Sequence, residues 1–526
     1  MSRQHENNQE KLRLLILCSA AVFCFGLAAH AYGFLNASFS HDMLNALVTD
    51  NVETYWKMQL GRPGIVLYRR LFRSAIAAPW QLGLLSLCWL SLSCYGITKL
   101  FAVRSRLFPI LLAGILSVNI TTIAQTATYL YEMDADLFAV LLGVCAVLLW
   151  DRAGWKGAVC GMLLTACCMA IYQSMLSVPI TLCMMQCIVI LLRGDAAVPV
   201  LKKGLRAVLM LGIGAVVYIL SVRVMCHWKG INLAMDSYNS MEQVVSASIL
   251  QRIGHVYRTW AAAFWDPEHA HIALPVLVAN ILLPLIGLWR LLLWLLKRNP
   301  GRRETVLLLV LIGLLPLGMN TAQLSFSRDI HDLMKYAFWF FHILCLLPIF
   351  LCPLPKKASQ LSGLLASAFV IIILCSNMQT ANIVYTKKHL EQDAALSLMT
   401  RVVYRLEEEP EYIAGETPLV FVGVSRQLQE KVPGFEVYYD ITGCESSSPI
   451  VKSLASYNYH AYAAYFRYIL NNPAIMADWT IWNAMQENPD VQNMPCYPDH
   501  GCIRIIDGQM VVKMGSLSAP MEGAPA

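Results

Sequence analysis

The stretch NASFSHDMLNALVTDNVETYWKMQLGRPGIVLYRRLFR, residues 36–73, lies between two apolar runs at 12–35 and 80–100. Its acidic residues come first and its basic residues second, with Tyr55 and Trp56 between them. A connector between two membrane helices needs only a few residues, so a charged, aromatic loop of this length is either functional or disordered. Its many Leu, Ile and Val residues argue against disorder. We therefore expect a pair of interfacial helices that hold an active site at the membrane surface.

The composition is that of a membrane protein. Of the 526 residues, 57% are hydrophobic and only 14% are charged, and the mean hydropathy is +0.52, whereas a soluble domain is about 25% charged. Most of the 17 cysteines lie in or beside apolar runs, where a thiol behaves as a small hydrophobe. Cys496 and Cys502 lie in the polar tail, where a disulfide and two free thiols are equal alternatives. The first apolar run lacks a clear small-residue cleavage site, which predicts an anchor.

The apolar runs predict a polytopic α-helical membrane protein with about eleven transmembrane helices, because about 20 apolar residues cross a bilayer. The runs are 12–35, 80–100, 107–126, 134–150, 157–173, 174–192, 205–226, 272–296, 305–319, 336–352 and 360–378. Loops on one side carry clusters of Lys and Arg, whereas the tight turns near 127–133 and 173–174 carry none. The positive-inside rule therefore places the N-terminus in the cytoplasm. The first outer loop, 36–79, and the tail then lie outside.

A change of composition predicts a transmembrane domain over 1–378 and an extracytoplasmic domain over 379–526. The tail opens with an apolar pattern of helical period at 383–409 and continues with a strand-like run at 418–424. Its end, IRIIDGQMVV, is typical of a β-hairpin that turns at Asp507-Gly508. These elements predict a small C-terminal α/β domain.

The tripeptide Ser40-His41-Asp42 follows the first span directly. A carboxylate at the bilayer edge can act as a general base, because partial desolvation raises its pKa; an acid that caps a helix is the alternative. Cationic side chains on the same loop could neutralise a phosphate that departs from a lipid carrier. They are Lys57, Arg62, Arg69 and Arg70. For Arg69, Arg70 and Arg73 the alternative is attraction to anionic headgroups.

The run TyrLeuTyrGluMetAspAlaAsp, residues 129–136, places three acids at a membrane boundary. Ionisable groups at this depth are costly and are candidates for function. Glu132, Asp134 and Asp136 could bind sugar hydroxyls, with Tyr131 beside them. Paired carboxylates also suit Mg²⁺ or Mn²⁺, so a divalent cation is an open alternative. A polar turn that caps a helix is the second alternative for these residues.

Three further polar segments lie between spans on the same side. Tyr172-Gln173-Ser174 brings uncharged hydrogen-bonding groups to the membrane face. In the 320–335 loop, Arg328 could clamp a phosphate bidentately, or pair with a neighbouring Asp. His331-Asp332 in the same loop has no HxxxH or CxxC spacing, which does not favour a metal site. The aromatic, amphipathic 227–271 loop predicts an interfacial helix.

The order of these pieces is similar to that of the C-type (GT-C) glycosyltransferases, and among them it resembles the bacterial type II O-antigen-conversion glucosyltransferases. The matching pieces are SerHisAsp at 40–42, GlyArgPro at 61–63, AlaThrTyrLeuTyrGluMetAsp at 127–134, TyrGlnSer at 172–174 and SerPheSerArgAsp at 325–329. The resemblance implies a GT-C-like fold in the bacterial inner membrane. It also implies transfer of a sugar, glucose, from a polyprenyl-phosphate donor to a glycan such as lipopolysaccharide on the outer face.

The resemblance further implies roles for single residues. Asp42 maps to the catalytic base, and Glu132 and Asp134 are further catalytic candidates. His41 stands where the family often has a first acid, which weakens a metal role. The expected ligands of the donor phosphate are Lys57, Arg62, Arg69 and Arg328. Those of the sugar are His41, Tyr131 and Gln173.

Two other functions fit part of the sequence. A transporter or flippase of lipid-linked saccharides usually shows internal repeats and Gly/Pro-broken helices at matching positions, and we find no such symmetry. Its polar groups would also lie at mid-depth rather than on one membrane face. A polymerase or ligase of lipid-linked glycans has the same topology and stays open. The sequence shows no nucleic-acid patch.

Overall fold

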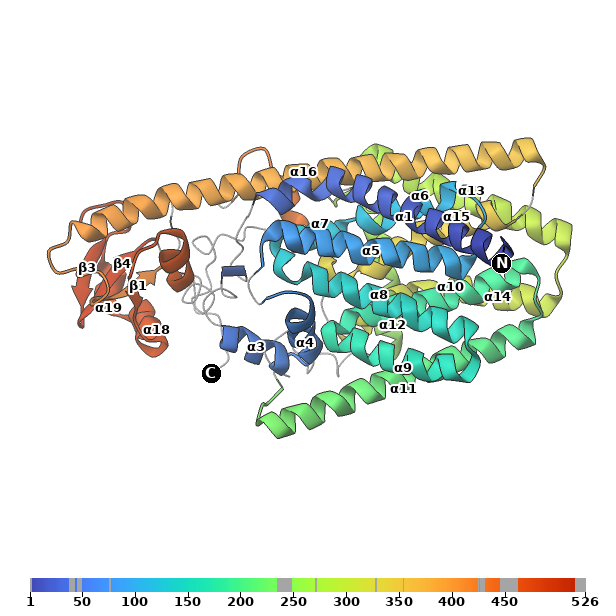
Figure 1. Cartoon of the computed structure of the whole chain (residues 1–526). Helices are drawn as coiled ribbons and strands as arrows, with labels where there is room; N and C mark the ends of the chain where they lie inside the picture. Colours follow the sequence, from blue (N-terminus) through green and yellow to red (C-terminus); the bar gives the residue numbers. More distant parts are fainter. Residues whose placement is uncertain are drawn as a thin grey trace.

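The computed structural model describes residues 2–36, 43–44, 50–74, 77–233, 248–269, 272–326, 329–352, 354–423, 425, 431–444 and 462–515. It shows a bundle of long helices with a small sheet beyond one end of it (Figure 1). Three predicted site residues, His41, Asp42 and Arg328, lie outside the described residues.

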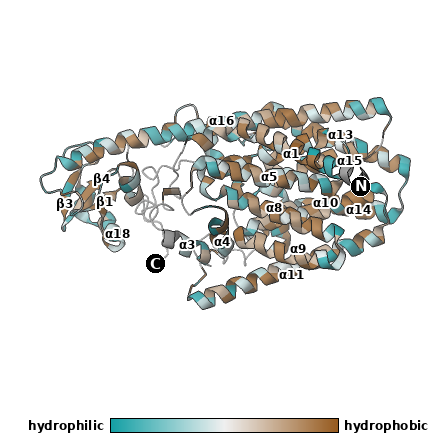
Figure 2. Cartoon of the chain, in the orientation of Figure 1, coloured by the Kyte–Doolittle hydropathy of each residue, from teal (hydrophilic) through white to brown (hydrophobic). Residues whose placement is uncertain are grey.

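The bundle is built from apolar helices. They are α1 (Ser2–Leu35), α5 (Pro79–Phe101), α6 (Leu107–Ser117), α7 (Ile120–Thr128), α8 (Leu130–Arg152), α9 (Gly154–Ile171), α10 (Ser177–Arg193), α11 (Ala197–Lys229), α13 (Leu274–Arg298), α14 (Arg302–Met319), α15 (Phe340–Leu351) and α16 (Lys356–Glu407). Hydrophobic residues dominate these helices, and hydrophilic residues become frequent where α16 leads to the sheet (Figure 2). An apolar surface of this extent is what a lipid environment requires.

Within the described residues, eight helices are long and apolar enough to cross a membrane, and nine if the bent pair α6–α7 counts as one span. This number is lower than the predicted number of about eleven, although each predicted apolar run contains a helix. α6 and α7 meet at 42°, because the Asn119 side chain accepts a hydrogen bond from the Thr122 amide and starts a new helix. α14 opens with three charged residues, and the apolar helix Tyr336–Leu351 is short.

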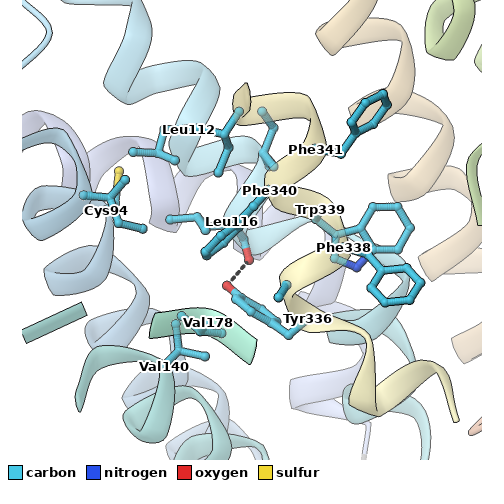
Figure 3. Packing of buried hydrophobic residues seen from close by; sticks show 14 of the residues in the cluster. Cys94, Leu112, Leu116, Val140, Val178, Tyr336, Phe338, Trp339, Phe340 and Phe341 are labelled. Atoms are coloured by element: carbon cyan, nitrogen blue, oxygen red, sulfur yellow. Dashed lines mark hydrogen bonds between the residues drawn. The ribbon is translucent and has the colours of Figure 1, made fainter. Parts of the chain in front are cut away.

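The bundle core packs around the segment that leads into α15 (Figure 3). Tyr336, Phe338 and Phe340 are buried there, and Phe340 and Tyr336 lie on the side of Leu112 and Leu116 of α6. The Tyr336 hydroxyl donates a hydrogen bond to the Leu116 carbonyl over 2.9 Å, which satisfies a group that has lost its water. This contact fixes the start of α15 against α6.

α16 runs without a break through the predicted domain boundary at 378/379. Its Val370 and Leu374 belong to the core of the bundle. Its Leu398 and Val402 belong to a second core, which the sheet completes. One helix therefore serves both parts of the molecule (Figure 1).

Within the described part of the tail, the sheet has four strands in the order β2-β1-β4-β3. They are β1 (Pro418–Val422), β2 (Ile475–Met476), β3 (Ile503–Ile506) and β4 (Gln509–Lys513). β1 pairs in parallel with both β2 and β4, and β3 and β4 form an antiparallel hairpin. Asp507 and Gly508 have φ angles of 49° and 75°, as a two-residue hairpin turn requires. The predicted strand and hairpin are confirmed.

Two short helices, α18 (Trp479–Glu487) and α19 (Pro489–Asn493), also belong to the sheet domain. Trp482 of α18 is fully buried beside Phe421 of β1, and these rings supply much of the second core. Cys496 and Cys502 are both free thiols, which agrees with the second of the two alternatives for this pair.

Candidate active site

Two short helices of the first loop, α3 (Asp50–Gln59) and α4 (Pro63–Phe72), lie at the end of the bundle nearest the sheet (Figure 1). They meet at the GlyArgPro sequence, where Gly61 has a φ of +71° and Pro63 takes the first turn of α4. α4 approaches α9 so closely that a Cβ on Gly64 would lie 2.7 Å from the Ala170 carbonyl carbon. The predicted pair of helices in this loop is therefore confirmed over 50–72.

Gly61 allows a first test of this turn. A Cβ there would lie 2.9 Å from the Tyr218 hydroxyl, which donates to the Gly61 carbonyl over 2.8 Å. Gly230 has a similar φ of +64° but no atom within 4 Å of its Cβ position. We expect Gly61→Ala to lower the melting temperature of the detergent-solubilised protein more than Gly230→Ala, because only Gly61→Ala adds a clash to the backbone strain of about 1–2 kcal/mol. Equal decreases would contradict the role of the Tyr218 contact.

Three cationic side chains converge on Glu132, in the first turn of α8. The Lys57 ammonium is paired with Oε1, Arg69 Nη2 lies 3.6 Å from the same oxygen, and Arg62 Nη1 lies 3.9 Å from Oε2. The side-chain exposure of Glu132 is 6%, and that of the cations lies between 5% and 18%. Buried charges need partners, so this cation cluster (Lys57, Arg62 and Arg69 around Glu132) is an obligatory unit of the structure. Two helix dipoles also favour it: that of α8 at Glu132 and that of α4 at Arg69.

The turn between α9 and α10 holds Arg62 in this cluster. The Arg62 guanidinium lies 4.3 Å from the centre of the Tyr172 ring, and its Nε donates to Gln173 Oε1 over 3.3 Å. Gln173 Nε2 in turn donates to the Leu60 carbonyl over 2.7 Å. The polar groups of this turn therefore orient a cation, which is more specific than the plain hairpin that the sequence also allowed.

Asp134 forms a separate buried ion pair with Arg73. Arg73 Nε and Nη2 lie 2.7 Å and 3.2 Å from the two carboxylate oxygens, and the two side chains are 1% and 0% exposed. Arg73 also donates to the Tyr131 carbonyl. Tyr68 lies beside this pair, and burial followed by the charge of Asp134 raises the pKa of its hydroxyl far above the usual value. This ion pair thus ties the end of α4 to the start of α8.

The third acid of the run, Asp136, accepts a hydrogen bond from Gln125 Nε2 of α7 over 3.1 Å. The three acids therefore have three different sets of partners. Across the described ranges, no three His, Cys, Asp or Glu side chains are placed to hold a metal ion.

The described parts of the other polar loops also form defined contacts. The predicted interfacial helix is α12 (Ile249–Trp265), which Ser248 and Gln251 start with a capping box. His255 Nε2 of α12 lies 3.0 Å from Asp329 in the 320–335 loop, and Lys335 Nζ of that loop lies 2.8 Å from Asp332.

The structure thus brings together most of the described residues that the sequence singles out. Lys57, Arg62, Arg69 and Glu132 form the cluster, with Tyr131 and Gln173 at its edge. Asp134 stands apart in its pair with Arg73. Sequence reasoning assigned no site role to Arg73, and it missed Tyr218, a lone phenol in the apolar run 205–226.

A known protein family matches the part of the chain that carries this candidate site. The family model described as "Glucosyl transferase GtrII" matches residues 31–351. The chain belongs to the GtrII glucosyltransferase family. The predicted resemblance to the type II glucosyltransferases is therefore confirmed, and membership of the GtrII family implies glucosyltransferase activity. The match contains the whole cation cluster and ends with α15. Neither curated proteins nor solved structures give a match to the chain.

Proposed function

We propose that this GtrII-family protein transfers glucose from a polyprenyl-phosphate donor to a glycan acceptor at the outer face of a bacterial inner membrane. The supporting observation is the cation cluster, which lies inside the family match at one end of an apolar bundle. Donor headgroup and polyprenyl chain would then meet the protein at the level of α3 and α4.

The chemistry explains why cations are needed. A sugar linked through a phosphodiester carries one negative charge on its phosphate, and the leaving phosphate gains a second when the bond to the anomeric carbon breaks. Fixed cations stabilise that second charge more than the first, so they lower the barrier rather than only binding the donor. Lys57, Arg62 and Arg69 are assigned to this phosphate, and Arg328, outside the described residues, remains a further candidate.

The acceptor hydroxyl attacks the anomeric carbon, the carbon–oxygen bond to phosphate breaks, and a carboxylate takes the hydroxyl proton. We assign the proton transfer to Asp42, which lies outside the described residues. Glu132 is the second candidate, and its three cationic partners favour a role in positioning them. Tyr131, Gln173 and His41 are assigned to sugar hydroxyls.

The proposed orientation rests on the ends of the bundle. The N-terminal end of α1 lies opposite the end that carries α3, α4 and the sheet (Figure 1). With the N-terminus in the cytoplasm, the cation cluster and the domain over 379–526 face the extracytoplasmic side, where the acceptor glycan is accessible.

Arg69 and its neighbour Arg70 provide a matched test. Both lie in the last turn of α4, but Arg69 is 6% exposed and paired with Glu132, whereas Arg70 is exposed. We expect Arg69→Gln to lower glucose transfer by at least about 100-fold, as loss of one charge-stabilising donor does, and Arg70→Gln to keep it within about threefold. The assay is transfer of labelled glucose from undecaprenyl-phosphate-glucose to isolated lipopolysaccharide by the purified protein. Equal activity of the two variants would reject the assignment of the cluster.

A further inference from the structure

A segment of the tail returns to the bundle and packs against α7. Residues 431–444, here called the tail strap, follow β1 and end inside the bundle core at Cys444. Thr128, the last residue of α7, donates a hydrogen bond to the Gly443 carbonyl over 2.5 Å. A Cβ on Gly443 would lie 3.1 Å from the Cβ of Ala124, one turn earlier in α7. The tail strap therefore touches α7 directly, with no room for a side chain between them.

A loop of the bundle contacts the same face of α7. Asp332 Oδ2 accepts hydrogen bonds from the amide and the hydroxyl of Thr442 over 2.9 Å and 2.8 Å. The Asp332 carbonyl accepts a hydrogen bond from Thr121 of α7 over 2.8 Å. Thr121, Ala124 and Thr128 are spaced at i, i+3 and i+7, so they share one face of the helix. All nine residues of α7 are buried, and the tail strap and this loop together cover that face.

A charged group on α16 holds the end of the tail strap. The Lys387 side chain is fully buried, and its ammonium lies 3.7 Å from the centre of the Tyr439 ring and donates to the Cys444 carbonyl. Lys387 also pairs with Glu391 over 3.2 Å, and Glu391 accepts a hydrogen bond from the Tyr439 hydroxyl over 2.6 Å. A buried charge needs all its partners, so Lys387 fixes the tail strap against the bundle.

The face of α7 that the tail strap covers leads directly to Glu132. Tyr129 alone separates the end of α7 from the start of α8. Its carbonyl accepts hydrogen bonds from the amides of Glu132 and Met133 over 3.0 Å and 3.1 Å, which form the first turn of α8. Thr128, which the tail strap holds, is the residue before Tyr129. A displacement of Thr128 therefore moves the backbone that carries Glu132.

The position of Glu132 matters because its three partners come from other helices. Lys57 belongs to α3, Arg69 belongs to α4, and Arg62 lies between these two helices. Two of the contacts are already long, at 3.6 Å to Arg69 and 3.9 Å to Arg62. The cation cluster therefore depends on where the start of α8 lies relative to α3 and α4. A misplacement of about 1 Å in a catalytic site can lower a rate about 100-fold.

We infer that the tail strap is a positioning element for glucose transfer. By holding α7, it places Glu132 among the three cations, and Thr128 and Gly443 are its positioning residues. The inference rests on the proposed function, because the cation cluster serves the proposed transfer. The family match ends at residue 351, so a segment beyond the match contributes to a site whose cations and carboxylate all lie within it.

Two glycines of the tail strap form a matched pair for the test. Gly443 and Gly434 have left-handed φ angles of 92° and 84°, but no described atom lies within 4 Å of the Cβ position of Gly434. Gly443→Ala and Gly434→Ala therefore add similar backbone strain, and only Gly443→Ala pushes against α7. We expect Gly443→Ala to lower the turnover number of the purified full chain at least about fivefold, and Gly434→Ala to keep it within about twofold.

A double-mutant cycle separates positioning from a general defect of structure. If the tail strap acts through Glu132, Gly443→Ala should lower turnover by less than about twofold in the Glu132→Gln protein, because the effects of coupled residues do not add. A general defect would lower turnover by the same factor with or without Glu132. Thr128→Val should behave as Gly443→Ala does, and Thr128→Ser, which keeps the hydroxyl donor, should recover turnover. Melting temperatures confirm that each variant folds.

Inorganic phosphate gives a readout that does not depend on glucose transfer. Phosphate can take the place of a displaced Glu132 carboxylate, so it should raise the melting temperature of Gly443→Ala more than that of Gly434→Ala. The inference is overturned if the two glycine variants of an active protein have the same turnover, if they show the same phosphate effect, or if Gly443→Ala lowers turnover equally with and without Glu132. The proposed function fails separately. If the unmodified protein transfers no glucose from undecaprenyl-phosphate-glucose while phosphate still distinguishes the two glycine variants, the donor is wrong and the placement of Glu132 by the tail strap stands.

Discussion

Glu132→Gln is expected to lower the turnover number for glucose transfer by at least about 100-fold, without raising the KM for the donor. The amide keeps the shape of the side chain but cannot hold three cations in place, and misplaced groups of this kind cost about two orders of magnitude. Lys57, Arg62 and Arg69 remain available to the donor phosphate, which is why its KM should not rise. Glu132→Asp keeps the charge and should recover part of the rate.

A second readout separates this role from simple loss of structure. Inorganic phosphate can stand in for the missing carboxylate, so it should raise the melting temperature of Glu132→Gln more than that of the unmodified protein. The matched control is Asp151→Asn, at the other end of α8, where Asp151 is paired with Lys203. We expect neither a phosphate effect nor a loss of turnover in this control. A Glu132→Gln protein with normal turnover would exclude Glu132 from the site.

Asp134→Ala should be among the most destabilising single changes in the bundle. It leaves the Arg73 guanidinium buried without the carboxylate that meets both of its nitrogens, and breaking such a pair costs about 3–5 kcal/mol. Asp151→Ala removes a carboxylate that is 14% exposed and paired with a 19% exposed lysine, so solvent can replace more of the lost interaction. Thermal unfolding in detergent should therefore show a clearly larger decrease for Asp134→Ala.

The double variant Asp134→Leu with Arg73→Met tests whether the unpaired charge of Arg73 causes this loss of stability. Apolar side chains of similar size often replace a buried ion pair without loss, so the melting temperature should return close to that of the unmodified protein. If the double variant is no more stable than Asp134→Ala, the cost comes from packing around α8 rather than from the charge.

Local chemistry explains which parts of the fold could be predicted. The hairpin at Asp507-Gly508 follows from a turn that two residues specify. The apolar runs predict where helices lie, but not that the Asn119 side chain splits one run into α6 and α7. Hydropathy also predicts a boundary near residue 378, because polarity rises there, whereas helix geometry does not depend on polarity and α16 continues.

In the candidate site, too, some residues could be predicted from the sequence and others could not. Charges near a bilayer edge are costly, so Lys57, Arg62 and Glu132 could be recognised from their position alone. The Arg73–Asp134 pair could not be predicted, since it depends on how α4 lies against α8. The burial of Lys387 could not be predicted either, because it depends on residues 431–444, more than forty residues further along the chain.

Because α16 is continuous, it fixes both the distance of the sheet from the bundle and the rotation of the sheet around the helix axis. Its 52 residues contain one glycine, Gly363, and no proline, and at 1.5 Å per residue the helix is about 78 Å long. Each residue added beyond Gly363 would turn the sheet by about 100° around the helix axis, since a turn takes 3.6 residues. The number of residues in this single helix therefore sets the rotation of the sheet relative to the end of the bundle that carries α3 and α4.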